Sequence, residues 1–122
     1  MFAEKSIEIG QVIHNYLEGI YQGDVERLRS SFTDNAQLRG EVKGAEYFKS
    51  LENYLEGVKN RKSPRELGEV FKMKILSLEI VGNVATAKLH VPMLGYNYYD
   101  FLSLCIVKGE WKIVNKLFTH VE

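Results

Sequence analysis

The sequence has one cysteine, no excess of charge of either sign and no long apolar run, and each absence excludes a class of protein. A single cysteine, Cys105, excludes an internal disulfide and any zinc site built from several cysteines. Sixteen Lys and Arg residues balance sixteen Asp and Glu residues, so the formal net charge is +0. Because a chain without net positive charge has no electrostatic field that attracts DNA or RNA, we expect no nucleic-acid partner.

Two further absences bear on where the protein works. No apolar run approaches the roughly 20 residues that a membrane-spanning helix needs. Residues 1–5 lack the basic start and apolar stretch of a secretory signal. We therefore expect no membrane association and a reducing, cytoplasmic setting. The 122 residues fit a single domain over 1–122, and a hydrophobic fraction of 45% is enough to bury a core.

The first half of the chain is predicted to be helical. Apolar residues recur at steps of three and four over 9–20, which is typical of a helix with one buried face. Gly23 can end this helix, and Asp24 can cap a short second one. After a turn and an extended piece over 36–42, we expect a third helix over about 45–58.

A first β-hairpin is predicted around the dipeptide Gly-Asn at 82–83, a typical two-residue hairpin loop, with the preceding strand over 70–81. Pairing the two valines that flank the loop places apolar side chains on one face and polar side chains on the other. This register pairs Leu76 with Leu89. The apolar phase changes near 75–76, which indicates a β-bulge or a sharp bend there.

A second hairpin is predicted around Lys-Gly at 108–109, between strands over 96–107 and 110–121. Both of its faces carry large apolar side chains, whereas a sheet with one wet face alternates apolar and polar residues. We therefore expect the helices to cover one face and a second copy of the chain to cover the other. The expected assembly is a homodimer formed through the outer sheet face.

The two ends of the chain carry recognisable motifs. Residues 16–24 contain a Gly-Asp turn before a short helix, and Phe32 with Asp-Asn-Ala at 34–36 leads into a strand. This resembles the opening of nuclear transport factor 2-like domains, which have a cystatin-like fold. Tyr-Asp-Phe at 99–101 and Lys-Gly-Glu-Trp at 108–111 resemble the subgroup labelled putative lumazine-binding, close to the polyketide cyclase (SnoaL-like) branch. The resemblance implies an α+β cone: a curved antiparallel sheet wraps around three N-terminal helices and leaves a pocket at its open end.

One branch of that superfamily, the ketosteroid isomerases, uses an Asp base together with a Tyr and a protonated Asp that stabilise an enolate. By this resemblance Tyr16 falls at the position of the catalytic Tyr. The base position falls on Gly40 and the second Asp position on Ser103. Without a base at Gly40, we do not expect proton abstraction by this route. Tyr16 is then either a pocket residue or one more member of the buried helical stripe.

The superfamily turns one face of the last hairpin toward its pocket, and Lys116 falls on that face in the predicted register. A lysine on an apolar face is costly unless it is paired or reaches water. It can hold an anionic ligand, act as a desolvated amine, or form a salt bridge with Asp100 or Glu18. A bulge in this hairpin would place Asn115 there in its stead. The candidate ligand-binding residues are Tyr16, Tyr99, Phe101, Ser103, Lys116, Phe118 and His120.

The remaining reactive side chains give weaker signals. His14, His90 and His120 have no spacing typical of metal ligands, so we expect no metal site. Cys105 lies between apolar residues of a strand and is interpreted as a small buried hydrophobe. The tyrosines at 96, 98 and 99 can stack on a flat ring such as a pteridine or flavin, but they also favour strands, so no cofactor is assigned. The basic run at 59–62 is interpreted as a solvated loop.

The sequence therefore predicts a cone that binds a small, mainly apolar or aromatic molecule, with no catalytic residue assigned. A first alternative is an isomerase, cyclase or dehydratase of the SnoaL-like kind, which an acid–base pair inside the cavity would favour. A second is a dimerisation or assembly module whose cone is plugged by Phe48, Phe101 and Phe118. An open cavity with a few converging polar groups favours ligand binding.

Overall fold

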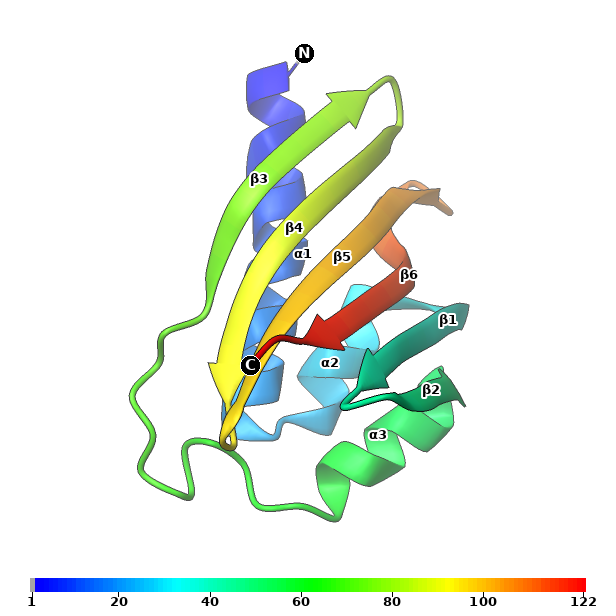
Figure 1. Ribbon diagram of the computed structural model, residues 1–122. Helices are drawn as coiled ribbons and strands as arrows, with labels where there is room; N and C mark the ends of the chain where they lie inside the picture. The colour runs from blue at the N-terminus through cyan, green and yellow to red at the C-terminus, as the bar shows by residue number, and fades with distance from the viewer. Residues whose placement is uncertain (1) are drawn as a thin grey trace.

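The computed structural model describes residues 2–122 and consists of three helices packed against one curved sheet (Figure 1). The helices are α1 (Phe2–Gln22), α2 (Val25–Ser31) and α3 (Leu51–Lys59). The strands are β1 (Phe32–Val42), β2 (Ala45–Ser50), β3 (Lys74–Val81), β4 (Val84–Met93), β5 (Tyr96–Val107) and β6 (Glu110–His120). Their order is β2-β1-β6-β5-β4-β3. Every neighbouring pair is antiparallel except β1 and β6, which run parallel. The predicted α+β cone is confirmed, with one parallel pair that the pattern did not indicate.

The helical layer is set by the turn between α1 and α2. Gly23 adopts a positive φ of 70° after α1, and the Asp24 side chain accepts a hydrogen bond from the backbone N–H of Arg27 at 3.1 Å, as expected for a helix cap. Gly19 allows the two helices to touch, because a Cβ there would lie 2.8 Å from Cγ of Leu28. In the part of the chain that the structure describes, none of the helices combines the length and the apolar composition that a membrane span requires.

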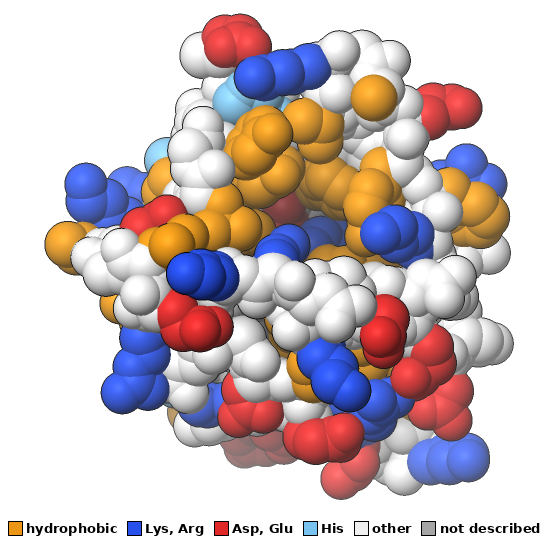
Figure 2. Space-filling view, turned by 90° about the horizontal axis from the view of Figure 1, so that it is seen from below, with side chains coloured by type: hydrophobic (Ala, Val, Ile, Leu, Met, Phe, Trp, Pro, Cys, Tyr) orange, Lys and Arg blue, Asp and Glu red, His pale blue; other side chains and the backbone are white. Residues whose placement is uncertain are grey.

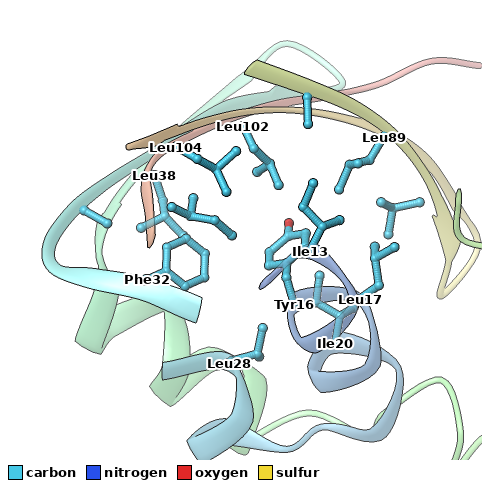
Figure 3. Packing of buried hydrophobic residues seen from close by; sticks show 14 of the residues in the cluster. Ile13, Tyr16, Leu17, Ile20, Leu28, Phe32, Leu38, Leu89, Leu102 and Leu104 are labelled. Carbon is cyan, nitrogen blue, oxygen red and sulfur yellow. The ribbon is translucent and has the colours of Figure 1, made fainter. Parts of the chain in front are cut away.

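The core fills the space between α1 and the concave side of the sheet. Figure 3 shows Tyr16 at its centre, with Ile13 and Leu17 of α1 facing Leu89 of β4 and Leu102 of β5. All five side chains are buried, and each buried Leu or Ile contributes roughly 1.5–3 kcal/mol. The core therefore holds α1 firmly beneath the strands that carry the candidate site.

The β3–β4 hairpin confirms the predicted register near its turn. Val81 pairs with Val84, and the pairing holds back to Ser77 with Lys88. The register then shifts between Ile75 and Ser77, which confirms the bulge. The predicted pairing of Leu76 with Leu89 is wrong, because the bulge gives that place to Ile75. The strand also begins later than predicted, at Lys74 rather than at residue 70.

The β5–β6 hairpin follows the predicted register from Val107 with Glu110 to Leu104 with Ile113, and then slips by one residue. Ser103 pairs with Asn115, because a bulge at Val114 adds a residue to β6. In β6 the inward side chains are odd-numbered before the bulge and even-numbered beyond it. In β5 the even-numbered side chains point inward on both sides of this point. The face predicted to point inward is therefore correct for the end of β6 and wrong for β5.

The segment 45–50 is the largest correction to the predicted helices. These residues form β2, an antiparallel neighbour of β1, and α3 begins only at Leu51. The strands join through Lys43 and Gly44, whose φ values of 52° and 84° are typical of a tight hairpin turn. The Ser50 side chain then caps α3 by accepting from the backbone N–H of Asn53 at 3.2 Å.

Candidate functional site

A cavity of about 90 Å³ lies at the end of the cone where α3 and the segment 60–73 meet the sheet. In Figure 2, which views that end of the molecule, a hollow is walled by hydrophobic side chains and has basic and acidic side chains inside it. The volume corresponds to roughly three water molecules. The lining residues are Ile20, Val42, Tyr47, Tyr54, Arg61, Val91, Met93, Tyr98, Asp100, Lys116 and Phe118.

Asp100 is the acidic group of this cavity and is only 2% exposed. The Tyr16 hydroxyl donates a hydrogen bond to its Oδ2 at 2.5 Å. Burial raises the pKa of Asp100, while the positive charge of Lys116 and the hydrogen bond from Tyr16 oppose the rise. Burial, reinforced by the neighbouring carboxylate, also raises the pKa of Tyr16 well above its usual range. Tyr16 therefore stays a neutral donor, and Asp100 takes up a proton more readily than an exposed Asp.

Lys116 enters the same cavity from β6 and is 6% exposed. Its Nζ donates to the Tyr54 hydroxyl at 3.4 Å. It also lies 4.5, 5.1 and 5.2 Å from the ring centres of Tyr54, Phe118 and Tyr16, at cation–π distance. Among residues 2–122, no ion pair includes Lys116, so the salt bridge to Asp100 or Glu18 is not formed.

Arg61 is the second cation of the cavity and comes from the segment that follows α3. Its Nη2 is buried and has no hydrogen-bond partner within residues 2–122. The segment is ordered by its own contacts: Ser63 and Glu66 exchange two hydrogen bonds of 3.1 Å, and the Tyr21 hydroxyl donates to the backbone oxygen of Glu69 at 2.7 Å. These contacts hold Arg61 at the cavity.

Three aromatic rings form one wall of the cavity. The Phe118 ring lies 4.9 Å from that of Tyr47 and 5.8 Å from that of Tyr98, both edge-on. Burial raises the pKa of Tyr47 and of Tyr98, and the positive charge of Arg61 opposes both rises. Gly40 makes this wall possible, because a Cβ at Gly40 would lie 2.5 Å from the Phe118 ring. The ring of Phe118 therefore lies over the position where the isomerase branch places its base.

Four of the predicted site residues lie at or beside the cavity. Lys116 and Phe118 line it directly. Tyr16 is not a lining residue, but its hydroxyl donates to Asp100 and its ring lies 5.2 Å from Nζ of Lys116, both of which line the cavity. His120 lies beyond the lining residues, and its Nδ1 accepts from the backbone N–H of Asn97 at 2.9 Å.

The other three predicted site residues are not brought to the cavity. Tyr99, Phe101 and Ser103 follow the outward phase of β5, whose inward residues Asp100 and Leu102 are buried. Tyr99 stacks on the ring of His90, with ring centres 4.7 Å apart. Phe101 is 46% exposed on the outer face. The single-residue slip at the β6 bulge accounts for all three placements.

Sequence reasoning missed Asp100 and Arg61 as cavity residues. Asp100 interrupts an alternation of buried apolar residues in β5, and an acidic residue in such a row is the signal that marks it. Arg61 left no comparable signal, since the basic run at 59–62 has the composition of a solvated loop. Among residues 2–122, no group of three or more His, Cys, Asp or Glu side chains is placed to hold a metal ion.

Comparisons with known proteins place this geometry in context. A family model described as "Putative lumazine-binding" matches residues 4–119. Similar solved structures include an NTF2-like protein of unknown function from Shewanella baltica OS155 (TM-score 0.86, 23% identity, 100% of this chain and 98% of that one). Another, from Silicibacter pomeroyi DSS-3, is also NTF2-like and of unknown function (TM-score 0.85, 19% identity, 99% of each chain). No curated protein matches.

A de novo designed protein with a curved β-sheet is also similar, with a TM-score of 0.60 and 18% identity over 97% of this chain and 98% of that one. At these identities the structural likenesses show the fold alone. Because one fold hosts many functions, the function has to be argued from the side chains of the cavity.

Proposed function

Because the chain belongs to the putative lumazine-binding family and has an NTF2-like fold, we propose that it binds a small, mainly apolar or aromatic molecule in its cone. The observation that carries the proposal is the cavity at the open end. Its wall is apolar and aromatic, and three polar groups, Arg61, Asp100 and Lys116, converge on it. An apolar pocket with a few placed polar groups is the usual form of a small-molecule site.

The positions of three phenylalanines support ligand binding over a filled assembly module. Phe48 is 59% exposed and Phe101 lies on the outer face, so neither enters the cone. Phe118 lines the cavity without closing it. A module that serves assembly alone has no need of buried charged groups around an open space.

Ligand binding is tested by thermal unfolding with a panel of flavin, pteridine, steroid and aromatic polyketide-like compounds. A ligand in excess stabilises the folded state by mass action, by about 2.7 kcal/mol at one hundred times its Kd. Val42→Phe narrows the cavity and should abolish the shift in melting temperature. Val81→Phe, on an exposed strand end, is the matched control and should keep it. A panel without any shift would contradict the proposal.

A second candidate function is an enzyme of the SnoaL-like kind, favoured by the Tyr16–Asp100 pair. The pair is at hydrogen-bond distance, and Asp100 borders the cavity with a raised pKa. A carboxyl group tuned in this way can act as a general acid toward a ligand oxygen. Mass spectrometry of a bound ligand after incubation separates the two functions, because a binder returns it unchanged.

We also propose a homodimer formed through the outer sheet face. Phe101 and Leu117 are 46% and 51% exposed there, side by side on β5 and β6. Sedimentation velocity at micromolar concentration should show a dimer, and Phe101→Glu should convert it to a monomer by placing a charge in the interface. Sedimentation of the unaltered protein as a monomer would refute the assembly.

A further inference from the structure

The cavity is lined by more cationic side chains than acidic ones. Arg61 and Lys116 are cations, whereas Asp100 is the single carboxylate among the lining residues. Burial raises the pKa of Asp100, which lowers the share of this carboxyl that is negatively charged. Whichever form Asp100 takes, the cavity keeps an excess of positive charge.

Neither cation forms an ion pair with a carboxylate of the described residues, although the charge of Lys116 acts on Asp100 across the cavity. Aromatic rings and one tyrosine hydroxyl surround the Lys116 ammonium group, and Nη2 of Arg61 is buried without any acceptor. Removing charged groups from water without pairing them is costly, and native proteins keep very few such groups. A cavity lined by the buried ammonium group of Lys116 and by the buried Nη2 of the half-buried Arg61 is suited to an anion that accepts hydrogen bonds from both.

The dimensions and walls of the cavity restrict the shape of that anion. About 90 Å³ is room for a carboxylate and little more, so the rest of the ligand has to extend through the open end of the cavity, which Figure 2 shows as a hollow at the surface. The rings of Tyr47, Tyr98 and Phe118 border the same space and offer flat apolar surfaces. The guanidinium group of Arg61 presents several N–H donors in one plane. The two oxygens of a planar carboxylate match this arrangement of donors, whereas a spherical anion does not.

We propose that the ligand is an acid, namely a carboxylate attached to a flat apolar or aromatic body, with the carboxylate held by Arg61 and Lys116. This inference rests on the proposed ligand-binding function and adds the chemical class of the ligand. The carboxylate oxygens accept from Nη2 of Arg61 and Nζ of Lys116, and the flat body lies against the aromatic wall.

The test compares acids with their neutral amides on the whole protein at pH 7 by isothermal titration calorimetry. The probes are benzoate and 1-naphthoate, each paired with benzamide or 1-naphthamide. We expect each acid to bind roughly tenfold or more tightly than its amide, because charge-assisted hydrogen bonds to a buried cation are strong.

Three variants show which residues cause the tighter binding of acids over amides. Arg61→Met and Lys116→Met should each remove most of it, whereas Arg65→Met, which removes an exposed arginine of the same segment, should leave it intact. Lys116→Met replaces an unpaired buried charge with an apolar side chain of similar length, so this variant is expected to fold.

The outcomes separate the two proposals. Equal affinities for acids and amides would overturn the acid specificity and leave the binding function standing. A preference for acids that persists in both Arg61→Met and Lys116→Met would overturn the assignment to these residues. No binding by any probe would overturn the inference, and the binding function is then judged by the thermal panel alone.

Discussion

Replacing Asp100 with asparagine is expected to stabilise the protein at neutral pH. Asparagine keeps an oxygen that accepts the hydrogen bond from Tyr16 but removes a negative charge from a buried position. Burial raises the pKa of Asp100 in the folded protein above its unfolded value, even though the charge of Lys116 opposes this. Ionised Asp100 is therefore a net cost to the folded state.

The sign of the pH dependence follows from the same shift. The folded state holds the Asp100 proton more tightly than the unfolded state does, so its contribution is most favourable below the unfolded pKa. That contribution is lost as the pH rises from the unfolded to the folded pKa, and the loss persists at higher pH. Asp100→Asn should remove this decline from the free energy of unfolding measured in urea across that interval.

Alanine at the same position should have the opposite effect. Asp100→Ala leaves the buried Tyr16 hydroxyl without an acceptor, which costs about 1–3 kcal/mol. Asp34→Asn, which neutralises an exposed carboxylate, is the matched control and should change little. The account of this site fails if asparagine destabilises the protein as much as alanine does.

Replacing Gly40 with alanine is expected to displace the Phe118 ring. The added Cβ would lie 2.5 Å from that ring, far inside contact distance. Overpacking of this kind typically costs about 1–3 kcal/mol of unfolding free energy. Because Phe118 lines the cavity and packs edge-on against Tyr47 and Tyr98, Gly40→Ala should also weaken ligand binding.

A double-mutant cycle separates this clash from other effects of Gly40→Ala. In a Phe118→Ala background the ring is absent, so the added methyl group should cost much less in unfolding free energy. The coupling between the two sites should therefore be large and measurable by urea unfolding. Additive costs would show that the two positions do not interact, and the proposed role of Gly40 would be wrong.

The hairpins could be predicted from the sequence because their turns and alternation agree. At 82–83 and 108–109, turn residues stand between two strands, and both predicted registers hold next to the turn. At 82–83 the apolar faces of the two strands also match in only one register. The slip at Val114 escaped prediction because the last hairpin is apolar on both faces. A one-residue shift there leaves the pattern equally plausible.

The strand β2 was missed for a different reason. Apolar residues at 47, 48, 51, 54, 55 and 58 fit a helical stripe, so the periodicity continued across the true start of α3 at Leu51. The decisive local signal was the Lys43-Gly44 turn, which returns the chain against β1. Pairing with β1 outweighs the helical pattern over these few residues.

The cavity could be predicted only in part. The unusual position of Lys116 marked it, and its phase on β6 was correct. The predicted register lacks the one-residue slip and therefore puts Asp100 on the face away from the cavity. The place of Arg61 depends on the path of the segment after α3, which is set by contacts with Tyr21 and Glu69 that no short-range pattern encodes.

The most direct test of the central claim, that the cavity at the open end of the cone accepts negative charge, is a crystal structure of the protein with 1-naphthoate. We predict carboxylate oxygens within hydrogen-bond distance of Nη2 of Arg61 and Nζ of Lys116, with the naphthalene rings against Phe118. Naphthoate bound elsewhere, or bound in the cavity with its carboxylate turned toward solvent, would contradict the account.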